Sequence, residues 1–340
     1  MKSPLTTLCY IEKDGKYLML HRVSKKHDVN KDKWIGIGGH FEEGESPEEC
    51  LLREAREETG LTLTSWRFRG IVTFMAEGWQ TEYMCLYTAD GFEGELCACD
   101  EGTLEWVAKE DLMNLNLWEG DKIFLKLLAQ DAPFFSLKLS YRGDVLQYAA
   151  LDGKQLELFD ICDEKGEPTG LVTERSVAHY LGIRHRTVYV WVVRRSGGRW
   201  QVLLQKRSAQ KTYPGCYGTS ASGHIMAGDD YEESAYRELK EEIGIDAAPG
   251  ELHCAGILTS YDCTEFGGEP FSDREISRVY VYHQAVDETS LQLQEEEVES
   301  VRWMDYEECL RHAEQGDDAF CINIRGMKLL EAYLERLESC

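Results

Sequence analysis

The sequence predicts two α/β domains in tandem, each with a mixed β-sheet between helices. Three observations point to this fold class. A long motif, G-x5-[ED]-x7-R-E-x-x-E-E-x-G-[LI], occurs twice without gaps, at residues 39–61 and 223–245. Each copy lies between apolar runs of strand length, and each half then has a Trp-containing run followed by a helix-like segment. Duplication of a whole pattern indicates an internal repeat, so we expect the same fold twice.

Strand-like runs flank both copies of the motif. Ahead of it, TTLCYIE and KYLMLHR are joined across Asp14-Gly15, and TVYVWVV and WQVLLQKR across Ser196-Gly197-Gly198. Such turns between apolar runs are typical of β-hairpins. After the motif, the first half continues with the runs GIVTFM, EYMCLYTA and LEWVA. The second half continues with AGILTSY, SRVYVYHQA and VRWMD. The predicted order in each half is β-β-loop-α-β-β-β-α, a mixed sheet between helices.

A domain boundary is predicted near residues 148–156, where AALDGKQ interrupts the apolar runs and offers a turn. This places the first domain at residues 1–150 and the second at 151–340. No long Pro/Ser-rich linker separates them. We therefore expect the two domains to contact each other, and an oligomer is compatible with the sequence.

The composition restricts the partners. A net charge of −25 argues against a nucleic-acid polymer, because phosphate backbones bind basic surfaces. Small phosphorylated substrates are compatible, since glutamates can hold divalent cations that neutralise phosphate charge. The twelve cysteines are scattered without a CxxC pair, which favours reduced thiols. The sequence has no signal-peptide pattern and no apolar run of membrane-spanning length, so we expect a cytoplasmic protein without a membrane partner.

Each motif predicts a helix with defined ends. Ser46 can cap the first helix, Pro47 suits the first helical position, and Glu49 completes a capping box. Gly60 supplies the left-handed residue that ends the helix. The corresponding end residues of the second helix are Asp230, Glu233 and Gly244. The residues expected to face the sheet are Leu51, Leu52, Ala55, Ala235 and Leu239.

One face of each helix carries closely spaced glutamates. Glu54, Glu57 and Glu58 have the spacing i, i+3, i+4, which places their carboxylates together. Like charges at this spacing destabilise an isolated helix by roughly 0.2–0.5 kcal/mol, and a hard cation such as Mg²⁺, or Mn²⁺, would compensate. Arg53 can hold a carboxylate in place. A solvated acidic helix is the alternative, but the duplication favours a metal site. The second motif has Arg237, Glu238, Glu241 and Glu242.

Both motifs resemble the Nudix box, G-x5-E-x7-R-E-U-x-E-E-x-G-U, a highly specific signature. The resemblance implies an α/β/α sandwich that hydrolyses a nucleoside diphosphate linked to another group. It implies a metal-dependent reaction in which water attacks the β-phosphorus, giving a nucleoside monophosphate and pyrophosphate. The metal ligands that it implies are the carbonyls of Gly38 and Ser222 and the carboxylates of Glu54, Glu57, Glu58, Glu238, Glu241 and Glu242.

A later glutamate often completes the metal set in this family or acts as the base. Glu101 fits in the first domain and Glu297 in the second, with Glu296 nearly as suitable. Ordinary surface acids are the alternative. The spacing does not distinguish the base among the candidates Glu57, Glu58, Glu101, Glu241, Glu242 and Glu297.

Basic side chains near the motif are candidates for phosphate contacts. Arg22 and Arg207 end the second strand of each half and resemble the family's phosphate-contacting arginine. His40 and His224 follow the last glycine of the loop. They can contact phosphate, although ordinary loop histidines are an equal alternative.

The two halves resemble different branches of the family. The first half resembles MutX-type 8-oxo-dGTP diphosphatases in KDKWIGIGGHFEEGES, which contains Trp34, and in LWEGDKIFLKLLAQDAPFFS. That resemblance implies that Trp118 stacks on an oxidised purine and that Asp121 accepts hydrogen bonds from it. A core position is the alternative for Trp118. Ile35 stands where some relatives have a base-contacting Asn.

The second half resembles Nudix hydrolases related to isopentenyl-diphosphate isomerase, in ELFDICDEKGEPTG and LLQKRSAQKTYPGCYGTSASGH. The isomerase has a catalytic Cys where this chain has Ser222, and it lacks the intact box that is present here. Both departures favour hydrolysis of an unidentified diphosphate. A nucleotide-sensing module and an isomerase are the alternatives.

Overall fold

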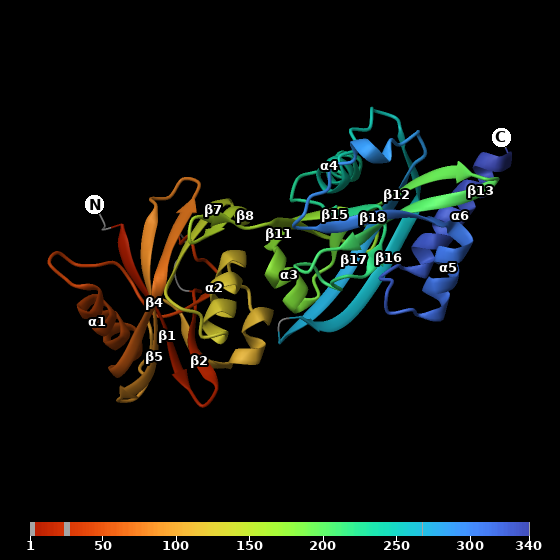
Figure 1. Ribbon diagram of the computed structural model, residues 1–340. Helices are drawn as coiled ribbons and strands as arrows, with labels where there is room; N and C mark the ends of the chain where they lie inside the picture. Colours follow the sequence, from red (N-terminus) through yellow and green to blue (C-terminus); the bar gives the residue numbers. More distant parts are fainter. Residues whose placement is uncertain (1–3, 24–27, 267, 340) are drawn as a thin grey trace. The chain divides into compact units, whose positions relative to one another are not determined.

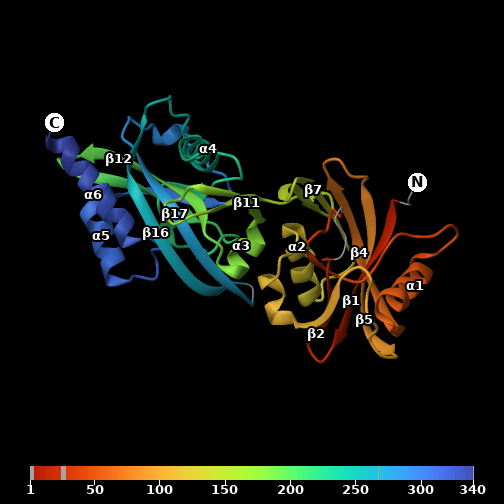
Figure 2. The ribbon, with the colours of Figure 1, turned by 180° about the vertical axis from the view of Figure 1, so that it is seen from behind.

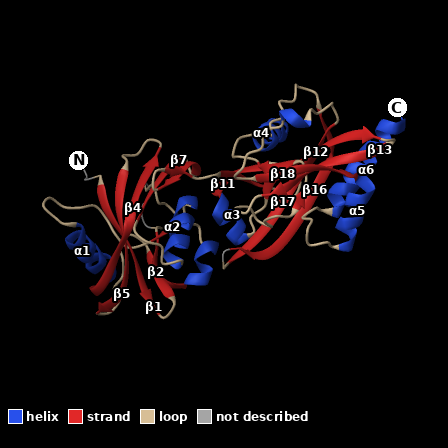
Figure 3. Cartoon of the chain, viewed as in Figure 1, coloured by secondary structure: helices blue, strands red, loops and turns tan. Residues whose placement is uncertain are grey.

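The computed structural model describes residues 4–23, 28–266 and 268–339. The chain divides into two compact units (Figure 1). Unit 1 comprises residues 1–158 and 171–177, and unit 2 comprises residues 159–170 and 178–340. In both units strands lie between helices (Figure 3), as the sequence predicts.

Unit 1 is built on a nine-stranded mixed sheet in the order β3-β2-β1-β5-β4-β7-β8-β9, with β6 paired to β2. The pairs β1–β5 and β4–β7 are parallel, and the other pairs are antiparallel. The strands are β1 (Leu5–Lys13), β2 (Lys16–His21), β3 (Trp34–Ile35), β4 (Thr62–Ala76), β5 (Glu82–Glu93), β6 (Thr103–Ala108), β7 (Phe135–Arg142), β8 (Val145–Leu151) and β9 (Lys154–Gln155).

Helices cover both faces of this sheet (Figure 1). Helix α1 (Pro47–Thr59) packs Leu51 and Ala55 into one buried cluster with residues of β1 and β2. Helix α2 (Glu119–Ala129) packs Phe124 against Tyr10 on the opposite face, with ring centroids 5.9 Å apart. A 3-10 helix, η1 (Lys109–Asn114), precedes α2. The first motif therefore supplies one outer layer of an α/β/α sandwich.

Unit 2 repeats the arrangement on a seven-stranded sheet in the order β14-β13-β12-β17-β16, with β15 paired to β12 and β18 to β13. The strands β12 and β17 run parallel, like β1 and β5 of unit 1. The strands are β12 (His185–Ser196), β13 (Arg199–Arg207), β14 (Tyr217–Gly218), β15 (Ala221–His224), β16 (Leu252–Phe266), β17 (Glu269–Tyr282) and β18 (Val298–Asp305).

Two apolar clusters lie on opposite faces of the unit 2 sheet. The view from behind shows the helices that cover these faces, one on one side and two on the other (Figure 2). Helix α4 (Tyr231–Ile243) buries Ala235 and Leu239 against β12. Helices α5 (Tyr306–Gln315) and α6 (Ile324–Ser339) pack around Trp191 on the other face. The remaining elements are β10 (Leu158–Cys162), β11 (Pro168–Glu174), α3 (Arg175–Leu181) and η2 (Glu288–Ser290).

The predicted order of elements is confirmed in both units, and so are the predicted helix ends. Ser46 and Glu49 form the capping box of α1, and Gly60 ends that helix with φ 77°. Gly244 ends α4 with φ 78°. The sequence interpretation missed the hairpin β7–β8, which extends the sheet of unit 1 alongside β4. It also missed the short elements from β10 to α3, because these runs are brief and lack a strong period.

The cysteines and the helices of the described residues bear on two expectations from composition. The eleven cysteines among them are free, so none is paired in a disulfide. Within residues 4–23, 28–266 and 268–339, no helix has the length and apolar character needed to cross a membrane.

Candidate functional site

The two carboxylates of α1 that face inward lie against the glycine loop of unit 1. The Gly38 amide donates a hydrogen bond to Oε2 of Glu58, at 3.0 Å. A Cβ atom on Gly39 would lie 2.4–2.6 Å from the carboxylate atoms of Glu54, which is too close for any side chain. Glycine at this position therefore makes room for the glutamate of the helix, and this explains why the motif begins with Gly.

Arg53 organises the acidic face of α1. Its guanidinium donates to Glu45 at 2.6 and 2.9 Å, to Glu54 at 2.7 Å and to Glu57 at 3.1 Å. It also donates to the carbonyl oxygen of His40, at 3.0 Å, which ties the helix to the loop. The hydrogen bond from Arg53 lowers the pKa of Glu45 to about 2. Arg53 therefore fixes several carboxylates that would otherwise repel one another.

Unit 2 has the same construction on α4. The Ser222 amide donates to Oε2 of Glu242 at 2.9 Å, and a Cβ on Gly223 would lie 2.1–2.5 Å from the Glu238 carboxylate. Arg237 lies 2.8 Å from Glu238 and 3.1 Å from Glu241. It also donates to the carbonyl oxygen of His224, at 3.2 Å. The two motifs thus agree in contacts as well as in sequence.

The glutamates on each helix divide into inner and outer positions. Glu57 and Glu241 are 60% and 54% exposed. Glu238 is buried, and burial raises its pKa to about 7, while Glu241 and Glu297 add to the shift. Burial likewise raises the pKa of Glu242 well above its usual value. Carboxylates crowded in this way favour a bound cation, which would relieve both the burial cost and the mutual repulsion.

The donor set fits Mg²⁺ or Mn²⁺. It consists of oxygen atoms, which these hard cations prefer, on a helix face whose carboxylates are held by arginine and by main-chain amides. The glycine cradle gives Glu54 and Glu238 the space that they occupy. The residues that would hold the cation are the motif glutamates, with Glu54, Glu58, Glu238 and Glu242 at the inner positions.

The later glutamates pair with different cationic side chains in the two units. In unit 1, Arg22 contacts Glu101 and also donates to Asp28, at 2.8 Å. In unit 2, Glu297 is contacted by Lys211, a residue that the sequence interpretation did not single out. Its only sequence signal is a lysine four residues after the strand-ending arginine.

Arg207 does not repeat the role of Arg22, although both end the second strand of their unit. Its guanidinium donates to the carbonyl oxygen of Thr212 at 2.6 Å and to the Thr212 hydroxyl at 3.0 Å. The site of unit 2 therefore differs from that of unit 1 in its cationic side chains, while the acidic helix is the same.

A buried group of polar and aromatic side chains lies at the start of α2 in unit 1. Trp118 is only 3% exposed, and its indole N–H donates to Asn30 at 2.9 Å. Its ring packs edge-on against Tyr141, with centroids 4.8 Å apart, and the Lys33 ammonium lies 4.9 Å from its centre. The Trp118 ring is therefore packed among side chains of the protein itself and is almost fully shielded from solvent. Asp121 is buried beside it, and burial raises the pKa of this carboxyl to about 8, with Lys33 opposing the shift.

Trp34 and His40 are the other two residues of the glycine-loop segment predicted to bind substrate. The Trp34 ring stacks on His21, with centroids 4.5 Å apart and an interplanar angle of 6°. His21 in turn contacts Asp32, at 2.9 Å. The main chain of His40 pairs with Thr6 of β1 and accepts from Arg53, so the loop position of this histidine is fixed through its backbone.

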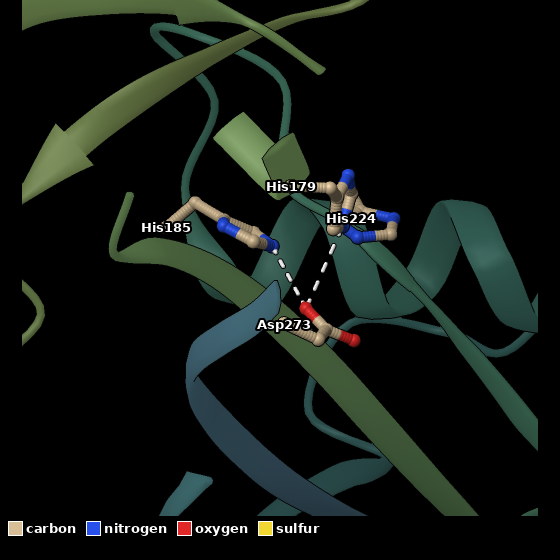
Figure 4. A group of neighbouring side chains, drawn as sticks. All are labelled: His179, His185, His224 and Asp273. Carbon is tan, nitrogen blue, oxygen red and sulfur yellow. Dashed lines mark ion pairs between the residues drawn. The ribbon is translucent and has the colours of Figure 1, made fainter. Parts of the chain in front are cut away.

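His224 belongs to a cluster that the sequence interpretation missed (Figure 4). It lies with His179, His185 and Asp273, and one ligand atom from each residue lies within 4.8 Å of the others. Nε2 of His179 and Nε2 of His185 lie 3.5 and 3.4 Å from the same oxygen of Asp273. The four residues come from α3, β12, β15 and β17, so no short spacing in the sequence could reveal them.

The Asp273 carboxylate and the neighbouring imidazoles shift one another's pKa values. Burial opposes ionisation of Asp273, but the adjacent imidazoles of His179 and His185 hold its pKa below its usual value. For His185, burial lowers the pKa, yet Asp273 and Glu275 outweigh it and the net shift is upward. Three imidazoles and one carboxylate form a ligand set that suits a borderline divalent metal such as Zn²⁺.

Two carboxylate helices, each facing a glycine loop with a clamping arginine, define a hydrolase acting on phosphoric anhydrides. Comparison with known proteins agrees, because the family model described as "NUDIX domain" matches residues 2–128 and 183–321. The chain therefore belongs to the Nudix family and carries two of its domains.

Individual relatives are consistent with this assignment. An uncharacterised Nudix hydrolase of Clostridium acetobutylicum is 34% identical over 178 residues, covering 51% of this chain and 84% of the relative. An oxidized purine nucleoside triphosphate hydrolase of Danio rerio is 30% identical over 152 residues, covering 44% of this chain and 95% of the relative. An isopentenyl-diphosphate Delta-isomerase of Corynebacterium diphtheriae is 28% identical over 151 residues, covering 44% of this chain and 79% of the relative.

Filling the glycine cradle should weaken metal binding. In Gly223→Ala the new Cβ would displace the Glu238 carboxylate, and we expect Mg²⁺ affinity of unit 2 to fall about 10–100-fold, as for the loss of other supporting contacts at metal sites. Calorimetric titration of the full chain measures this. Gly326→Ala is the control, because its Cβ meets only Leu258 at an ordinary 3.6 Å. Unchanged affinity in Gly223→Ala would contradict the cradle.

The buried Asp121 carboxyl should make unit 1 less stable as the pH rises. Its pKa is about 8 in the folded state and about 4 when unfolded, so between these values the folded state holds the extra proton. Stability then falls with rising pH, by at most about 1.4 kcal/mol per pH unit. Asp121→Asn should remove this fall, as measured by urea unfolding at pH 5 and pH 8. Parallel pH profiles of wild type and variant would contradict it.

A matched surface carboxylate provides the control for this measurement. Asp131 is exposed, and hydrogen bonds from Arg69 and Arg67 lower its pKa. Its contribution to stability is therefore lost only at pH values below the window used here. We expect Asp131→Asn to leave the slope between pH 5 and pH 8 unchanged.

Proposed function

We propose that unit 1 hydrolyses oxidised purine nucleoside triphosphates such as 8-oxo-dGTP, with Mg²⁺ or Mn²⁺ as the cofactor. The products are a nucleoside monophosphate and pyrophosphate. Unit 2 hydrolyses a different diphosphate with the same kind of carboxylate helix. The single observation that carries the proposal is the repeated set of inward glutamates fixed by arginine and loop amides.

The bond cleavage is supported by what the side chains on α1 can do. The metal, when bound, lowers the pKa of the attacking water and neutralises charge on the phosphates. Arg53 and the Gly38 amide keep Glu54 and Glu58 oriented toward the loop. The exposed Glu57 and the half-buried Glu101 are the groups available to accept a proton. Arg22, next to Glu101, supplies positive charge for a phosphate oxygen.

An oxidised purine as the base is supported by the polar side chains around Asp121. With a pKa of about 8, this carboxyl carries its proton at neutral pH, so it can donate a hydrogen bond as well as accept one. Lys33 and Asn30 add polar groups beside Trp118. The Danio rerio relative is named for hydrolysis of oxidised purine nucleoside triphosphates, which agrees with this choice.

A separate substrate for unit 2 is supported by the differences between the sites. Arg207 is turned to Thr212, Lys211 takes the place beside Glu297, and His224 joins a histidine cluster. The helix α4 keeps all three motif glutamates, which favours hydrolysis over a sensing role. Ser222 stands where an isomerase would need a cysteine, so we place isomerisation second.

Single substitutions should assign each activity to its unit. Glu57→Gln should lower cleavage of 8-oxo-dGTP by at least about 100-fold, because it removes a carboxylate needed for metal binding or proton transfer. Glu241→Gln should leave that activity unchanged and abolish cleavage of the unit 2 substrate. Pyrophosphate release and product identity provide the measurement, over a panel of nucleotides, sugar nucleotides and isoprenoid diphosphates. Glu105→Gln, on an exposed position of β6, is the control.

The opposite pattern, with Glu241→Gln abolishing 8-oxo-dGTP cleavage, would overturn the assignment of units. If no compound of the panel is cleaved by unit 2 but nucleotides bind to it, a sensing module is the better interpretation. If Glu241→Gln leaves an isomerase activity intact, the second alternative gains support.

A second candidate function of unit 2 is suggested by the cluster of His179, His185, His224 and Asp273. We propose that it binds one transition metal, separate from the cation on α4. Asp273→Asn should remove about one equivalent of Zn²⁺ from the protein reconstituted with Zn²⁺, as determined by elemental analysis, whereas Glu241→Gln should retain it. His253→Ala removes one member of a stacked histidine pair outside the cluster and is the control. Equal metal content in Asp273→Asn and wild type would refute this site.

A further inference from the structure

Lys211 lies between two carboxylates of the unit 2 site. Its ammonium forms a hydrogen bond with Glu297 and lies 4.0 Å from Oε1 of Glu242. The lysine side chain is 23% exposed and that of Glu242 is 1% exposed, so these charges interact at low effective dielectric. A cationic group is thus placed against the acids on which a metal would bind.

The second oxygen of Glu242 is already occupied. Oε2 accepts the Ser222 amide at 2.9 Å and the side-chain amide of Gln205 at 3.1 Å. The other oxygen, Oε1, is the one that lies toward Lys211. The ammonium therefore faces the one oxygen of Glu242 that a cation can use.

The loop that carries Lys211 is tied to the segment of Glu297. The Ser208 amide donates to the carbonyl oxygen of Glu297 at 2.9 Å, and the Ser208 hydroxyl donates to that of Glu296 at 2.5 Å. At the other end of the loop, Thr212 holds Arg207. Lys211 is consequently a flexible side chain on an anchored backbone, which can redirect its ammonium without moving the loop.

Unit 1 provides an independent comparison. There the later glutamate, Glu101, is also contacted by a cationic side chain, but by Arg22 at the end of the second strand. Unit 2 uses a different residue, four positions further along, because its own strand-ending Arg207 is held by Thr212. Both units thus place a cationic side chain against the later glutamate, Arg22 at Glu101 and Lys211 at Glu297. This recurrence points to a role of the positive charge in the site.

We propose that the ammonium of Lys211 occupies the position of a metal cation between Glu242 and Glu297, and that metal binding releases it to the phosphates of the substrate. The inference rests on the proposed hydrolase function of unit 2. A divalent cation and an ammonium cannot share these oxygens, because Mg²⁺ binds at about 2.0–2.1 Å and the two charges repel. The displaced lysine gains a new anionic partner when phosphate binds. Metal and phosphate binding become mutually supportive, since coupling between two ligands is reciprocal.

The test uses the full chain carrying Glu54→Gln and Glu57→Gln, which remove metal ligands of unit 1. Mn²⁺ affinity is measured by calorimetry and by electron paramagnetic resonance, with and without inorganic phosphate at fixed free Mn²⁺. In this parent chain, phosphate should strengthen Mn²⁺ binding about fivefold or more. Adding Lys211→Met should tighten Mn²⁺ binding about tenfold without phosphate. It should also abolish the strengthening by phosphate. Lys211→Arg, which keeps the charge, should retain both properties of the parent.

Lys240→Met is the matched control, because Lys240 is exposed, pairs with Asp246 and carries the same charge. Thermal unfolding verifies that each variant is folded. Weaker or unchanged Mn²⁺ binding in folded Lys211→Met, or phosphate coupling that survives it, overturns the inference but leaves the hydrolase assignment intact. Absence of Mn²⁺ binding by unit 2 in the parent and all variants would instead refute the proposed function.

Discussion

The approach of a helix carboxylate to a glycine loop is the contact on which both sites depend. In unit 1 Glu54 fills the space beside Gly39, and in unit 2 Glu238 fills the space beside Gly223. A main-chain amide then fixes the next carboxylate along each helix. Because the helix also buries Leu51 or Leu239 against the sheet, the position of these acids is set by the hydrophobic core. The acidic face is therefore a rigid part of the fold.

Much of the fold and the shared part of the site could be predicted from the sequence. The repeat located both helices, and local rules identified their ends, because a capping serine, an N-terminal proline and a left-handed glycine act over only a few residues. The hairpin β7–β8 was missed since its apolar pattern carries no motif. Helical spacing predicted that the glutamates share one face, but their division into inner and outer positions became visible only in the structure.

The residues that distinguish the two units could not be predicted in this way. His179, His185, His224 and Asp273 meet only because four separate elements converge. The different partners of Arg22 and Arg207 depend on a loop conformation, which sequence spacing does not specify. Burial was equally hidden: it gives Asp121 a pKa of about 8, although the same residue on a surface would be an ordinary acid. Function shared by the repeats is thus local in sequence, while specificity arises from tertiary packing.

The hydrogen bonds to Glu242 have a consequence for coordination chemistry. With Oε2 engaged by the Ser222 amide and by Gln205, this carboxylate can offer a metal only its remaining oxygen. In unit 1 the Gly38 amide likewise donates to Oε2 of Glu58. Monodentate ligation of this kind uses one coordination position per glutamate. A cation held in this way would have coordination positions left for water and for phosphate oxygens of a substrate.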